Sequence, residues 1–200
     1  MASAVILGPT DHGKPLAPDE FMAGDYQEGF KYELVEGKLY VAPLPNLSDD
    51  RVEIWLLLKL VLYSREHPEV VNHVTDKARV FVPTGSVDTI PEADIAAYRN
   101  FPVHLPFQKV RWQDVSPLLV VEIVSADDPD KDLVRNVDLY LQVPSIKEYW
   151  ILDARKEPER PHLLVYRRSR GKWRRMEVGP DEAYSTNLLP GFPLVMNARS

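Results

Sequence analysis

Two acidic residues in strand-like surroundings could carry chemistry in this sequence. Asp94 opens the apolar run of residues 95–98, and Glu122 lies inside the apolar, β-branched run of residues 117–125. Such a run is typical of a strand buried on both faces, where a carboxylate is costly unless it is paired, protonated or bound to a cation. If the two strands are neighbours, the acids would form a hard oxygen site for a divalent cation and support metal-assisted hydrolysis. The alternative is one structural acid and one ordinary acid at a strand end.

The rest of the sequence predicts the elements that would position these acids. The predicted order is a short helix over 19–23, two strands within 32–41, a helix from a cap at Asp49-Asp50 to about His67, strands at 70–71, 78–82 and 94–98, a long loop over 99–117, a strand over 118–124, a helix from 128–130 to about 143, a strand over 148–153, and a hairpin of 163–167 and 173–178. The apolar residues at helical spacing are Ile54, Leu57, Leu58, Val61 and Leu62 in the first long helix, and Leu133, Val137, Tyr140 and Leu141 in the second. This order predicts a mixed α/β (α+β) fold with a central sheet flanked by helices and a C-terminal hairpin.

Composition limits the class of protein. The chain has 200 residues and no cysteine, which suits one domain and excludes disulfides, zinc–thiolate sites and cysteine nucleophiles. Residues 1–17 are expected to form a flexible arm, and residues 18–200 a single domain. No signal peptide or membrane span is evident, so we expect a cytoplasmic protein without a membrane partner. The net charge of −6 argues against non-specific binding to polyanions but allows a local basic surface.

Four stretches together match a known pattern. They are Tyr32-Glu33-Leu34-Val35-Glu36-Gly37, Glu92-Ala93-Asp94-Ile95, residues 117–125, and the series Asp132, Tyr140 and Glu148-Tyr149-Trp150-Ile151. With these stretches the chain resembles the Uma-type restriction-endonuclease-like family, within the PD-(D/E)XK nuclease superfamily, over about residues 18–195. Ala93 stands where the family usually has proline.

The resemblance implies a restriction-endonuclease-like core and hydrolysis of DNA phosphodiester bonds. It implies that Asp94, Glu122 and the main-chain carbonyl of Ile123 hold Mg²⁺ or Mn²⁺, which would neutralise the scissile phosphate and lower the pKa of the attacking water. Glu33 would be a third acid, direct or through water. Its alternative is a solvated acid at a strand end. A homodimer is expected by analogy, because cutting two strands favours two sites.

Three further positions depart from the family pattern. Val124 stands where the superfamily has its lysine, Asn136 stands where the family places a lysine on the following helix, and Asp49 stands where the family often has histidine. An amide cannot replace an ammonium in stabilising charge, so Arg135 or Lys131 would have to supply it. Two classes therefore stay open: a metal-dependent endonuclease, and a catalytically degenerate nuclease-fold protein that acts as a binding or assembly module.

A basic stretch follows near the C-terminus, interleaved with Tyr166 and Trp173. It comprises Arg167, Arg168, Arg170, Lys172, Arg174 and Arg175. One interpretation is a hairpin that contacts nucleic-acid phosphates. The other is an exposed edge hairpin that uses charge to avoid pairing with other sheets.

Overall fold

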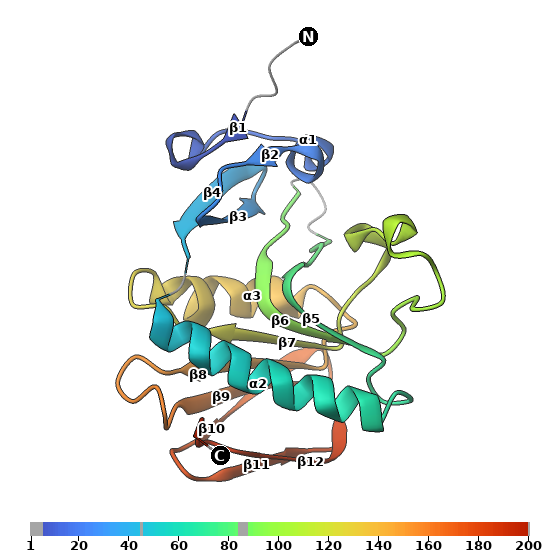
Figure 1. Ribbon diagram of the computed structural model, residues 1–200, viewed down its shortest axis with the longest axis vertical. Coiled ribbons are helices and arrows are strands. Elements are labelled where there is room, and N and C mark those ends of the chain that lie inside the picture. The colour runs from blue at the N-terminus through green and yellow to red at the C-terminus, as the bar shows by residue number, and fades with distance from the viewer. Residues whose placement is uncertain (1–5, 45, 84–87, 200) are drawn as a thin grey trace.

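A six-stranded mixed sheet forms the centre of the computed structural model, which describes residues 6–44, 46–83 and 88–199. Its strands are β5 (His73–Arg79), β6 (Glu92–Tyr98), β7 (Leu119–Ile123), β8 (Glu148–Asp153), β9 (His162–Ser169) and β10 (Lys172–Val178). Their order is β10-β9-β8-β7-β6-β5, with β7 and β8 parallel and the other neighbours antiparallel (Figure 1). The predicted α/β fold with a central mixed sheet is confirmed.

Helix α2 (Leu47–Glu66) covers one face of the sheet, together with a hairpin of β11 (Ala183–Thr186) and β12 (Leu189–Val195) (Figure 1). Sequence patterns did not predict this hairpin, because prolines and a glycine interrupt β12. Glu148 ties it to the sheet. Its buried carboxylate accepts hydrogen bonds from Trp150 (2.8 Å), Arg167 (2.8 Å), Tyr184 (2.9 Å) and Thr186 (2.5 Å).

Helix α2 differs from its prediction at its start and in its buried face. Asn46, not Asp49-Asp50, caps it by accepting hydrogen bonds from the main chain of residues 48 and 49. Its core side chains are Val52, Trp55, Leu56, Leu60 and Tyr63, whereas Ile54, Leu58 and Leu62 are exposed. The helix is apolar on two sides, and helical spacing alone selected the exposed one.

The opposite face of the sheet is covered by η4 (Lys131–Arg135), one turn of π-helix, and by α3 (Asn136–Leu141). Tyr140 packs here against Tyr149, with ring centroids 5.0 Å apart. The helix predicted over about 128–143 is found over residues 129–141, with the wide turn of η4 inside it. Isolated π-turns inside helices are often found at functional sites.

The N-terminal segments form a small unit beside the main sheet (Figure 1). It contains β1 (Ile6–Leu7), η1 (Pro9–Asp11), α1 (Pro18–Ala23), β2 (Asp25–Tyr26), β3 (Phe30–Val35) and β4 (Lys38–Pro43). The predicted turn at Glu36-Gly37 is confirmed, and both residues have positive φ (50° and 69°), as a tight hairpin turn requires. Leu34 and Ile90 exchange backbone hydrogen bonds, which fix this unit to the chain leading into β6.

Two further sequence expectations concern the N-terminal arm and the long loop. Residues 6–17, expected in a loose arm, contain β1 and η1, and residues 1–5 lie outside the described residues. The expected loop over 99–117 contains only the short turns η2 (Phe107–Lys109) and η3 (Trp112–Asp114). No helix in the part of the chain that the structure describes is long and apolar enough to cross a membrane.

Candidate active site

Asp94 and Glu122 lie on neighbouring antiparallel strands, β6 and β7. The register pairs Ile95 with Val121, so the two acids are opposite each other on the face that α3 covers. The main-chain N–H of Ile123 donates to Asp94 Oδ2 (2.7 Å), and the N–H of Asp94 donates to Glu122 Oε2 (3.4 Å). The sheet therefore holds both carboxylates in one place.

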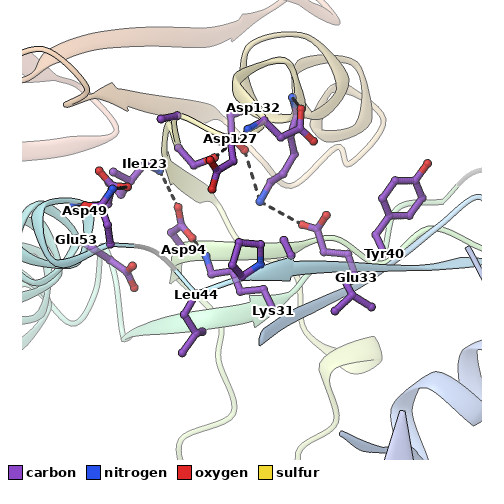
Figure 2. A pocket seen from close by; sticks show the side chains of 18 of the residues that line it. Lys31, Glu33, Tyr40, Leu44, Asp49, Glu53, Asp94, Ile123, Asp127 and Asp132 are labelled. Atoms are coloured by element: carbon purple, nitrogen blue, oxygen red, sulfur yellow. Dashed lines mark hydrogen bonds and ion pairs between the residues drawn. The ribbon is translucent and has the colours of Figure 1, made fainter. Parts of the chain in front are cut away.

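Asp94 has a cationic partner that sequence reasoning missed. Lys31 of β3 forms an ion pair with Asp94 Oδ1 (Figure 2). Burial opposes ionisation of Asp94, but the ammonium groups of Lys31 and Lys131 hold its pKa below the ordinary value. The available signal was the spacing from Glu33, since residues two apart on a strand share a face.

Glu33 lies in the same place and is buried, not solvated. It accepts hydrogen bonds from Arg135 Nη2 (2.6 Å) and from the N–H of Glu92 (3.2 Å), and Lys131 Nζ lies 3.5 Å from its Oε1. Burial raises the pKa of Glu33, but Lys131 and Arg135 outweigh it and lower the pKa overall. Lys131 and Arg135, the two basic residues that could replace the family lysine, therefore both face the site.

Glu122 is fully buried and is held by neutral groups. Its Oε1 accepts hydrogen bonds from the Tyr140 hydroxyl (2.8 Å) and the Asn136 amide (3.1 Å). The same amide donates to Asp132 Oδ1 (3.2 Å). Burial raises the pKa of Glu122 well above its ordinary value, with Asp94 and Asp132 adding to the effect against the attraction of Lys131. The Asn136 amide therefore bridges two buried acids, Glu122 and Asp132.

Arg135 and Asn136 lie where the π-turn η4 meets α3. Arg135 Nε donates to Asn136 Oδ1 (3.1 Å), and the two side chains contact Glu33 and Glu122, respectively.

A pocket of about 530 Å³ opens above these groups. Its walls include Lys31, Glu33, Asp94, Lys131, Asp132 and Arg135, whereas Glu122 lies behind the wall. Asp49 and Glu53 line the pocket from α2 (Figure 2).

Asp49 and Glu53 are nearly as buried as the strand acids, at 5% and 8% exposed. Asp49 Oδ2 accepts a hydrogen bond from the Asn46 amide (2.9 Å). Glu53 has no hydrogen-bond or ion-pair partner among the residues that the structure describes. Burial, and then Asp94, raises the pKa of Glu53 to about 7. Sequence reasoning noted Asp49 but missed Glu53, although residues four apart share a helix face.

The basic hairpin divides into two groups. The Arg168 guanidinium donates to the carbonyls of Tyr140, Leu141, Val143 and Ile146, and it lies over the Trp173 ring. Arg167 donates to Glu148 and Tyr184. The exposed remainder is Arg170, Lys172, Arg174 and Arg175, on the hairpin turn and the edge strand β10.

The site supplies carboxylate oxygens, the ligand type that hard divalent cations prefer. Within residues 6–44, 46–83 and 88–199, no three His, Asp or Glu side chains lie close enough to hold a metal ion as they stand. Lys31 occupies one oxygen of Asp94, which shows that this carboxylate already attracts a cation. The type of donor therefore fits a divalent cation, whereas the present positions of the acids do not form a set of ligands.

A mixed sheet with α2 and α3 on opposite faces, and paired acids on two central strands, defines a nuclease-like fold. The chain belongs to the Uma2 family, described as “Putative restriction endonuclease”, whose model matches residues 18–197. The chain is also similar to the crystal structure of “a putative nuclease belonging to DUF820” from Anabaena variabilis, with 16% sequence identity and a TM-score of 0.66 over 92% of this chain and 96% of that one. At this identity the likeness shows the fold. No curated protein matches the sequence significantly.

Proposed function

We propose that the protein is a metal-dependent endonuclease that hydrolyses DNA phosphodiester bonds. The observation that carries the proposal is the opposed pair of Asp94 and Glu122 beside a pocket that also contains two lysines and Glu33. Family membership supports the same reaction class.

Asp94, Glu122 and the main-chain carbonyl of Ile123 would hold the cation. When bound there, Mg²⁺ or Mn²⁺ would neutralise the scissile phosphate and lower the pKa of the attacking water. Tyr140 and Asn136 fix the orientation of Glu122, and Arg135 fixes that of Glu33.

Lys31 and Lys131 take the part of the missing family lysine. Each ammonium group lines the pocket and lies against a site carboxylate, so each can turn toward a phosphate that enters. A preorganised positive charge of this kind is often worth a few kcal/mol in the transition state, roughly 3 kcal/mol per donor.

The second candidate is a binding module without catalysis. It is favoured by Asn136 in the lysine position, and by the internal ion pairs that already neutralise Glu33 and Asp94. Such a protein would retain DNA or partner binding and lack cleavage.

Cleavage of supercoiled plasmid with Mg²⁺ or Mn²⁺ separates the candidates. The endonuclease proposal expects nicked or linear product from the wild type and none from Asp94→Ala, which controls for contaminating nuclease. Asn136→Lys should increase the rate, because it places an ammonium group beside Glu122 and Asp132. No product from the wild type, from Asn136→Lys or with either metal ion would favour the binding module.

We also propose that two copies associate, since a duplex presents two strands to cut. Sedimentation equilibrium of the full chain would give a mass of twice 22.9 kDa. A single species at the monomer mass would contradict it.

A further inference from the structure

We propose that the exposed side of helix α2 is the surface through which two copies of this chain associate, with their α2 helices antiparallel about a twofold axis. This inference rests on the association of two copies proposed above, and it adds the surface and the orientation. It does not depend on cleavage of DNA, because the surface lies outside the pocket.

The surface is an apolar stripe along α2. Leu47, Ile54, Leu58 and Leu62 are 75%, 47%, 56% and 58% exposed. At about 100° per residue, these four side chains lie within an arc of about 80° around the helix. In the described part of the chain, no helix or strand lies over this side of α2 (Figure 1). Exposed apolar side chains that are contiguous in this way mark interaction sites.

The stripe has a hollow at one end and projecting side chains at the other. The hollow, of about 780 Å³, is lined by Leu47, Ile54 and Trp55 from the helix and by residues 158–159 and 198–199. Leu58 and Leu62 project from the other end. When two such helices pair antiparallel, the projecting leucines of each copy meet the hollow of the other. A patch that carries both a projection and its complement suits an isologous interface, in which the same patch of both copies is in contact.

The charges at the two ends of the stripe select a second copy and an antiparallel orientation. Asp50 lies near the N-terminus of α2 and Arg65 near its C-terminus, and both are exposed. An antiparallel pair brings Asp50 of each copy beside Arg65 of the other, whereas a parallel pair brings like charges together. Because one helix carries both charges, a second copy of the chain supplies the complement of each.

Association through this stripe leaves the proposed active site open. Asp49 and Glu53, which line the pocket, are turned by more than about 100° around α2 from the centre of the stripe. Leu56 and Leu60 face the sheet on the core side of the helix. A dimer of this kind therefore presents two accessible pockets, one for each strand of a duplex.

Sedimentation equilibrium of the full chain tests the surface by mass alone. The wild type should show twice 22.9 kDa. Leu58→Asp would place a carboxylate without a partner inside the interface, so we expect the Kd for self-association to rise at least about tenfold. Val134→Asp, which changes an equally exposed apolar residue (58%) on η4, is the matched control and should associate as the wild type does. The circular dichroism spectrum, unchanged in both variants, checks the fold.

Introduced cysteines test the orientation without background, because the chain has no cysteine of its own. Positions 54 and 58 face each other across the axis of the antiparallel pair, so the variant with Ile54→Cys and Leu58→Cys should form disulfide-linked dimers on mild oxidation. Leu62→Cys should not, because the two copies of position 62 would lie about 18 Å apart along the helices. A disulfide joins Cα atoms at most about 7 Å apart.

Charge reversal tests the ends of the stripe. Asp50→Arg should weaken association, and the variant with Asp50→Arg and Arg65→Asp should restore it, because the paired charges are exchanged and not lost. A dimer that Leu58→Asp leaves intact would overturn the inference while the proposed association stands. Cross-linking of Leu62→Cys as fast as the double cysteine variant would overturn the antiparallel orientation. A wild type found only at the monomer mass would overturn both the surface and the association, and none of these measurements uses cleavage.

Discussion

The buried carboxylates of the site have different kinds of partner, and burial and these partners together set the direction in which each pKa is shifted. Glu33 and Asp94 contact ammonium or guanidinium groups and have lowered pKa values. Glu122 contacts a phenol and an amide, and its pKa is raised. Glu53 has no partner among the described residues, and its pKa is about 7. One site therefore contains acids whose pKa values are shifted in opposite directions.

Lys31→Met tests whether the lysine is needed for stability when no divalent ion is present. Removing one member of a buried ion pair leaves the other charge without compensation, which costs about 3–5 kcal/mol. We therefore expect chemical denaturation in a chelating buffer to show a loss of about 3 kcal/mol for Lys31→Met. Lys38→Met, an exposed lysine on the adjacent strand, should change stability by less than about 0.5 kcal/mol.

The outcome for Lys31 has an internal check. In an Asp94→Asn background the same lysine substitution should cost much less, because the charge that it compensates is gone. Equal losses in the two backgrounds would mean that Lys31 stabilises the fold through packing alone.

Glu53 predicts a pH dependence of stability with a definite sign. Its pKa is raised from 4.5 to about 7 in the folded state, mainly by burial and by Asp94, with Asp76 adding to this and with Lys31 and Lys77 opposing it. The folded state then binds the proton more tightly than the unfolded state, so this contribution is complete below pH 4.5 and is lost as the pH rises to about 7. Glu53→Gln should be as stable as the wild type near pH 4 and more stable at pH 8 by roughly 1–3 kcal/mol. Urea denaturation at the two pH values measures this, and an equal difference at both would contradict it.

Among the elements, η4 and α3 show what a sequence pattern does and does not reveal. The apolar positions Leu133, Val137 and Tyr140 predicted a helix, because they lie on its sheet-facing side. The contacts of Arg135 with Glu33 and of Asn136 with Glu122 cannot be read from that pattern, because they involve the polar side of the helix. The helix was therefore predictable, and its polar contacts were not.

For helix α2, the sequence pattern predicted the helix but not the face that packs against the sheet. Two apolar stripes run along it, and the pattern could not tell which one meets the sheet. The choice of stripe also decides that Asp49 and Glu53 face the pocket, so an acid that three-dimensional packing brings to the site escaped sequence reasoning.

Arg168 contacts the end of α3 through its guanidinium group. Its guanidinium satisfies main-chain carbonyls at the helix C-terminus, and hydrogen bonds to charged groups contribute roughly 1.5–3 kcal/mol. We expect Arg168→Ala to lower the free energy of unfolding by about 2–3 kcal/mol. Arg174→Ala, on the exposed edge strand, should lower it by less than about 0.5 kcal/mol. Equal losses of stability in Arg168→Ala and Arg174→Ala would contradict a special role of Arg168 at the end of α3.

The exposed basic side chains are the ones to test for DNA. If Lys172 and Arg174 contact phosphates, replacing both with alanine should weaken DNA binding and reduce the slope of log K against log salt concentration by about 2. Fluorescence anisotropy at several salt concentrations measures the slope. An unchanged slope, together with new self-association, would favour the role of protecting the sheet edge.

On the scale of the whole molecule, the pocket draws its residues from segments far apart in the sequence. The strand acids could be found because their local surroundings are unusual and because they match a family pattern. The sequence around Lys31 and Glu53 has no unusual feature of this kind. They become part of the site only when β3 and α2 pack against the main sheet, which hydrophobic periodicity does not specify.

The position of the N-terminal unit has a consequence for how the protein matures. Lys31 and Glu33 are carried by β3, outside the six-stranded sheet, and the backbone hydrogen bonds between Leu34 and Ile90 help to link β3 to the chain before β6. A chain whose N-terminal unit has not yet docked presents Asp94 and Glu122 without these neighbours. If the chain cleaves DNA as proposed, cleavage would therefore depend on the docking of this unit against the main sheet.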